Sequence, residues 1–158
     1  MESVLRAVLI TTLLAISAAG SAAAADLGDN DGRTTHLYQE RSNPAESMDE
    51  FVARISTQAV AVTDERRVSL CGVIGQSGDS YSIRIGTSST WKRCEIDLGD
   101  TADGFTSTGA TFHTHTSDED SVRGFSAQEF NRPRGYIAYG KVVRYQEGRT
   151  KDRPIKTR

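Results

Sequence analysis

The 158-residue sequence predicts one α+β domain, with an N-terminal helix, a mixed β-sheet and a short helix late in the chain. Between residues 48 and 62, apolar residues recur with the spacing of a helix that buries one face. The stretches 68–75, 81–85 and 142–145 are rich in β-branched and aromatic residues, and Gly and Asp stand between them. This pattern is typical of strands joined by tight turns.

The first 25 residues have the features of a secretion signal. Ala7 to Ile16 is apolar, and Ala23-Ala24-Ala25 supplies the small residues that signal peptidase accepts. The apolar run is too short to be a good membrane span. We therefore expect cleavage near Ala25, a secreted or periplasmic mature protein, and no membrane span after signal cleavage.

Residues 26–42 are rich in Gly, Asn and Asp and predict a flexible linker. Asp29-Asn30-Asp31-Gly32 begins like a calcium-binding loop, but no helices flank it, so a linker is preferred. We place the domain at 43–146 and a basic flexible tail at 147–158. The formal net charge is −2 and the basic residues gather in that tail, which argues against a nucleic-acid partner.

Asn43 and Pro44 predict the start of the first helix, as its N-cap and first residue. After this helix, the strand over 68–75, a turn over 76–79 and the strand over 81–85 predict a hairpin. A second hairpin, turning at 140–141, is expected to end the domain.

Cys71 and Cys94 are the two cysteines of the chain. In an oxidising compartment a single pair of cysteines usually forms a disulfide. A thiol nucleophile and a mixed metal site are the alternatives. Neither cysteine belongs to a Cys-x-x-Cys motif, so the disulfide is preferred.

Thr111-Phe112-His113-Thr114-His115-Thr116 places two histidines on one face of an expected strand. They can share a metal ion at about 2.0–2.1 Å per Zn–N bond. Ser126 and Glu129 have the spacing of neighbours on a helical turn. Two histidines, a carboxylate and a water are the ligands of a catalytic zinc site. The alternatives are a solvated histidine pair and a Ser–Glu capping box, and the box is compatible with metal binding.

His113-x-His115, a loop and Ser126-x-x-Glu129, preceded by a helix and a Cys-Gly-Val-Ile-Gly strand, resembles the signature of JAMM (MPN-type) metallopeptidases. The resemblance implies a JAMM/cytidine-deaminase-like fold and Zn²⁺ held by His113, His115 and Glu129. It also implies that Ser126 positions the reacting carbonyl and that an upstream Glu is the general base, for which Glu65 is the nearest acid. In the family an Asp occupies the position of Glu129, and the loop before the Ser is shorter.

The resemblance implies a secreted zinc-dependent hydrolase of peptide or isopeptide bonds, acting on a peptide, a protein or peptidoglycan. The alternative is a catalytically degenerate JAMM-like module for binding or for association with an effector. Asp118 or Asp120, in the acidic loop after the histidines, is an alternative third ligand. His36 is expected at the surface or as a distant fourth ligand. A hydrolase of the histidine-triad kind is disfavoured because Ser117 stands where a third alternating histidine is needed.

Overall fold

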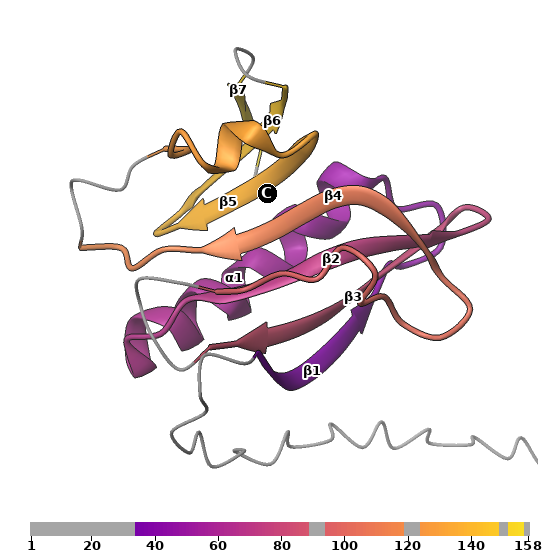
Figure 1. Cartoon of the computed structure of the whole chain (residues 1–158), viewed down its shortest axis with the longest axis horizontal. Helices are drawn as coiled ribbons and strands as arrows, with labels where there is room; N and C mark the ends of the chain where they lie inside the picture. Colours follow the sequence, from indigo (N-terminus) through magenta and orange to yellow (C-terminus); the bar gives the residue numbers. More distant parts are fainter. Residues whose placement is uncertain (1–33, 89–93, 119–123, 149–151, 157–158) are drawn as a thin grey trace, which may run out of the picture.

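The computed structural model describes residues 34–88, 94–118, 124–148 and 152–156. These residues form one mixed seven-stranded sheet and one α-helix, which confirms the predicted α+β class (Figure 1). The helices are α1 (Met48–Arg66) and the one-turn 3₁₀ helix η2 (Glu129–Asn131). The strands are β1 (Thr35–Arg41), β2 (Leu70–Ser77), β3 (Ser80–Thr87), β4 (Thr106–Thr114), β5 (Arg134–Tyr139), β6 (Val142–Glu147) and β7 (Asp152–Ile155).

The strand order is β1-β3-β2-β4-β5-β6-β7, and β4 lies at the centre of the sheet. β4 and β5 are parallel, whereas the other neighbouring strands are antiparallel. Parallel strands need a long crossover connection. The connection over 115–133 has this role and carries η2, which lies beside β5 in Figure 1.

One face of the sheet packs against α1 and forms the hydrophobic core. Phe51, Ile55 and Ala59 of the helix are buried there with Leu70 of β2 and Phe112 of β4. Each large apolar side chain buried in this way contributes about 1.5–3 kcal/mol. Because side chains alternate along a strand, His113 and His115 project from the opposite face.

The α1 helix begins later than predicted. Its N-cap is Ser47, whose Oγ accepts a hydrogen bond from the Glu50 N–H, while the Glu50 carboxylate accepts one from the Ser47 N–H. This capping box satisfies the first free amides of the helix. Ala45 has a φ of 61°, so the chain at Asn43–Pro44 is not helical and the predicted start was wrong.

The predicted domain limits are too narrow, because β1 and β7 lie outside 43–146. Residues 35–41, placed in a flexible linker, form edge strand β1 on β3, and Leu37 and Tyr38 pack against the core. β7, placed in a flexible tail, pairs with β6 and buries Ile155. Pro154 is tolerated there because an edge strand leaves one side of its backbone unpaired.

Among the described residues, no helix has the length and apolar character needed to cross a membrane. The predicted signal peptide, the stretch resembling a calcium loop and Asp120 lie outside the described residues.

Candidate metal centre

His113 and His115 lie at the carboxyl end of β4, with ring centroids 5.0 Å apart. The residue between them, Thr114, points to the opposite face. Its Oγ1 lies 2.5 Å from Thr63 Oγ1 of α1 and accepts a hydrogen bond from the Leu70 N–H. These buried contacts fix the orientation of the strand end. As predicted, both imidazoles project from one side of the sheet.

Glu129, at the start of η2, brings a carboxylate to the two imidazoles. Its Oε1 lies 2.5 Å from His113 Nε2 and 3.6 Å from His115 Nε2. Its Oε2 accepts a hydrogen bond from the Ser126 N–H at 2.5 Å, and Ser126 Oγ accepts one from the Glu129 N–H at 3.3 Å. One carboxylate thus closes the capping box with one oxygen and faces both histidines with the other. The capping box is therefore present, and it is compatible with metal binding by Glu129.

The three side chains fit a metal ion. They offer ligand atoms that lie within 4.8 Å of one another. His113 Nε2 is buried and, despite its closeness to Glu129, has no partner at hydrogen-bonding geometry among the described residues. A buried polar atom without a partner is costly. A cation bound by His113 and Glu129 together would give Nε2 a partner, which supports the predicted set of ligands.

His113 and Glu129 are both held in the protonation state that binds metals. Burial lowers the pKa of His113 and outweighs the opposing effect of Glu129. Burial alone would raise the pKa of Glu129, but the contacts with His113 and His115 outweigh it and hold this pKa well below its usual range. The folded chain therefore favours a neutral His113 imidazole and an ionised Glu129 carboxylate.

We predict that the metal-free protein loses stability as the pH falls. Below about pH 6.5 the unfolded His113 takes up a proton that the folded one resists, and below about pH 4.5 the same holds for Glu129. The unfolded state then binds more protons, so the free energy of unfolding decreases with falling pH. Urea unfolding at pH 7.5, 6, 5 and 4 measures the effect. Glu129→Gln should flatten the part below about pH 4.5, and an unchanged slope there would contradict the assignment.

The three residues lie in a cleft of about 720 Å³. Its wall includes an acid, Glu95, and a base, Arg132, neither of which the sequence analysis identified. The other lining residues are Ser69, Cys94, Ile96, His113, His115, Ser126, Gln128 and Glu129. The candidate metal centre thus borders an open cleft that has charges of both signs.

The side chain of Gln146 in β6 holds the backbone of η2 in place. Its side chain is 1% exposed, and its Nε2 donates hydrogen bonds to the carbonyls of Glu129 and Arg132, each at 3.2 Å. Groups that hold the backbone of a metal ligand orient its side chain. Sequence reasoning missed this residue because a single Gln in a strand resembles any solvated position.

We predict that Gln146→Leu weakens zinc binding by about 10-fold or more, the usual effect of removing a group that orients a ligand. The apolar side chain cannot bond the two carbonyls, so η2 and Glu129 lose their fixed position. Competition with a chromogenic chelator measures the affinity. Gln39→Leu, on edge strand β1, is the matched control. Equal affinities in the two variants would show that Gln146 does not orient the ligand.

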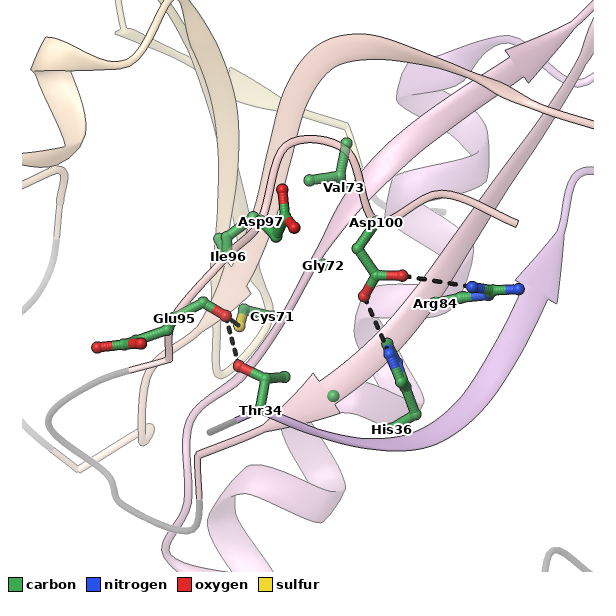
Figure 2. A pocket seen from close by; sticks show the side chains of 11 residues that line it. Thr34, His36, Cys71, Gly72, Val73, Arg84, Glu95, Ile96, Asp97 and Asp100 are labelled. Carbon is green, nitrogen blue, oxygen red and sulfur yellow. Dashed lines mark hydrogen bonds and ion pairs between the residues drawn. The ribbon is translucent and has the colours of Figure 1, made fainter. Parts of the chain in front are cut away.

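Three residues that the sequence analysis named as a possible base or as possible metal ligands lie away from the ligand cluster. Glu65 is exposed on the last turn of α1, which packs on the other face of the sheet, and it does not line the cleft. Asp118 is exposed and pairs with Arg67 at 2.8 Å, so it is not brought to the ligand cluster. His36 pairs with Asp100 at 3.0 Å in a second pocket and not with the other histidines (Figure 2).

Cys71 and Cys94 form the predicted disulfide, with Cα atoms 5.8 Å apart. This rules out the alternative of a thiol nucleophile in the folded, oxidised chain. Cys71 of β2 pairs in register with His113 of β4, so the disulfide lies on the face of the sheet that carries the histidines.

Comparisons of the chain with protein-family models, curated proteins and solved structures give no significant match. A function for this chain is therefore inferred from its site.

Proposed function

We propose that the chain is a secreted zinc-dependent hydrolase of peptide or isopeptide bonds, similar to the JAMM metallopeptidases. The observation that carries the proposal is the convergence of His113, His115 and Glu129 on one point at the side of an open cleft. Exported chains meet peptides, proteins and peptidoglycan, which are the substrates we propose. The Cys71–Cys94 disulfide agrees with an oxidising compartment.

Two imidazoles and one carboxylate suit zinc, and three protein ligands leave a position for water. A catalytic zinc ion lowers the pKa of its water to about 7 and polarises a carbonyl. Ser126 lines the same cleft, where its hydroxyl can donate a hydrogen bond to the oxyanion that forms on the attacked carbonyl. Arg132 can stabilise the same negative charge.

A specific observation favours the alternative, a catalytically degenerate binding or effector-associated module. The acid nearest to the expected base position, Glu65, does not line the cleft. Without a base, proton transfer worth about 10²–10⁴-fold in rate is missing. A module of this kind would still bind zinc.

The test is zinc-dependent cleavage by the exported chain. Its probes are a fluorescently labelled unfolded protein, a peptide with a lysine isopeptide bond and cross-linked peptidoglycan fragments. We expect new amino groups from at least one probe in the presence of zinc, and none with His115→Ala. Zinc binding with no cleavage of any probe would support the binding module, and the absence of zinc binding would end both proposals.

A further inference from the structure

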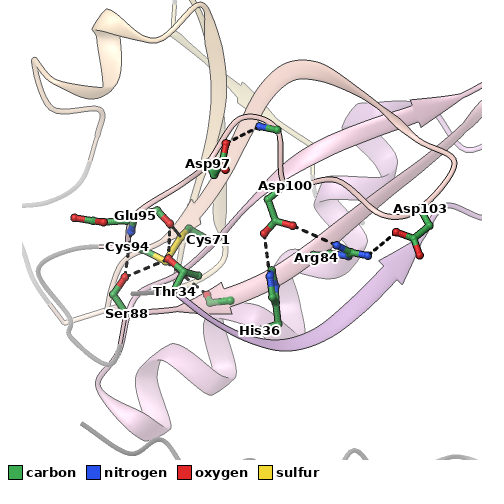
Figure 3. Close-up of polar contacts among 12 residues, drawn as sticks. Thr34, His36, Cys71, Arg84, Ser88, Cys94, Glu95, Asp97, Asp100 and Asp103 are labelled. Atoms are coloured by element: carbon green, nitrogen blue, oxygen red, sulfur yellow. Dashed lines mark hydrogen bonds and ion pairs between the residues drawn. A yellow bond between two sulfur atoms is a disulfide. The ribbon is translucent and has the colours of Figure 1, made fainter. Parts of the chain in front are cut away.

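The disulfide ties a loop segment to strand β2, and its Cys94 lines the metal cleft. Cys71 lies opposite His113 in the sheet, and Cys94 begins the described segment that leads back towards β4. Figure 3 shows the disulfide joining β2 to this segment directly before Glu95. The residue next to Cys94 is therefore held close to the metal ligands.

The backbone of Glu95 is fixed on both sides. Its N–H donates a hydrogen bond to Ser88 Oγ at 3.1 Å, and its carbonyl accepts one from Thr34 Oγ1 at 2.5 Å (Figure 3). With the disulfide one residue away, the main chain at Glu95 is held at three points. Supporting contacts of this kind are what hold a functional carboxylate in one place.

Glu95 lines the second pocket as well as the cleft that holds the histidine pair. In Figure 2 its carboxylate points away from the ion pair of His36 and Asp100. The acids among the described residues that line this cleft are Glu95 and Glu129. Glu129 is engaged with the two imidazoles, so among the described residues of this cleft Glu95 is the carboxylate left for proton transfer.

We propose that Glu95 is the proton acceptor of the hydrolase and that the Cys71–Cys94 disulfide is its positioning device. This inference rests on the proposed function. The Glu95 carboxylate takes a proton from the attacking water as the new C–O bond forms. It then gives that proton to the leaving nitrogen as the C–N bond breaks, so no oxidant or reductant is consumed. The disulfide itself stays intact throughout.

The first test uses the zinc-loaded exported chain and acetohydroxamic acid, which gives up a proton when it binds to zinc. A carboxylate that accepts protons from zinc-bound groups stabilises this complex. We expect Glu95→Gln to weaken acetohydroxamate binding by about 10- to 100-fold, the effect of losing one hydrogen bond to a charged group. Zinc content should stay at the wild-type level. Asp97→Asn, in the same segment, is the matched control and should bind as the wild type does.

The second test asks whether Glu95 needs its fixed position as well as its carboxylate. Thr34→Val with Ser88→Ala removes both backbone anchors of Glu95, and Cys71→Ala with Cys94→Ala removes the tether, while every metal ligand remains. Both double variants should keep stoichiometric zinc and lose acetohydroxamate affinity as Glu95→Gln does. Glu95→Asp should recover part of the affinity. A merely structural role for the disulfide predicts instead that zinc and acetohydroxamate binding fall together.

Equal acetohydroxamate affinity in wild type and Glu95→Gln would overturn the inference even if zinc binds and probes are cleaved. Loss of affinity in Glu65→Gln instead would assign proton transfer to Glu65 and overturn it too. Absence of zinc from the wild type would refute the proposed function first, and the inference with it. The metal measurement thus distinguishes the two failures.

Discussion

His113→Ala abolishes zinc binding by the exported chain, whereas His36→Ala leaves it at one equivalent. His113 and His115 offer the two nitrogen ligands, and Nε2 of His113 is the buried atom that has no other partner among the described residues. His36 lies in another pocket and pairs with Asp100, so its loss removes no ligand. The comparison uses two of the three histidines of one chain and so controls for the loss of an imidazole as such.

Elemental analysis after dialysis against buffered zinc measures the metal content. Thermal unfolding is the independent readout, since zinc at about 1,000 times its dissociation constant stabilises the folded state by about 4 kcal/mol. For a domain of this size that is a rise in Tm of about 10 °C or more. The wild type and His36→Ala should show this rise and His113→Ala should not. Equal zinc content in the two variants would refute the metal centre.

Replacing both cysteines by Ala should lower the free energy of unfolding by about 3 kcal/mol in the chain-entropy model. The two half-cystines are separated by 23 positions, and the bond restrains the unfolded chain by closing that loop. Cys71 is 1% exposed, so the smaller alanine also costs packing.

Urea unfolding under oxidising conditions measures the loss of stability in the double cysteine variant. The midpoint should fall, and circular dichroism in water should show the same folded spectrum, because the α1 core lies on the other face of the sheet. Ser88→Ala, which removes a hydrogen bond beside the disulfide, should cost about 1 kcal/mol and serves as the control. A loss below about 1 kcal/mol for the double variant would mean that the unfolded chain retains structure without the bond, or that the bond strains the folded state.

The sequence correctly predicted the elements whose patterns span only a few residues. The apolar stripe of α1, the turn between β2 and β3 and the His-x-His pattern on β4 depend on periodicity, and the structure has all three. The start of α1 was placed too early because Asn43–Pro44 and Ser47–Glu50 both have capping chemistry. Only the second pair closes a reciprocal box.

The structure corrected the assignments that depend on distant partners. β1 is polar in composition, and it is a strand because β3 offers it an edge to pair with. The sequence analysis named Glu65 as the candidate base and did not identify Glu95. The difference between them is that α1 packs on one face of the sheet and the disulfide holds Glu95 at the other.

The order of residues by itself predicted that two histidines share one face of a strand, that Ser126 and Glu129 have the spacing of a capping box and that the two cysteines pair. The first two relations span only a few residues, and the third follows from the presence of two cysteines in the chain. Only the tertiary structure decided which carboxylates meet the imidazoles, because η2 reaches them through the β4–β5 crossover and Gln146 anchors it from another strand. Such meetings depend on strand order and on packing over long separations, which local periodicity does not encode.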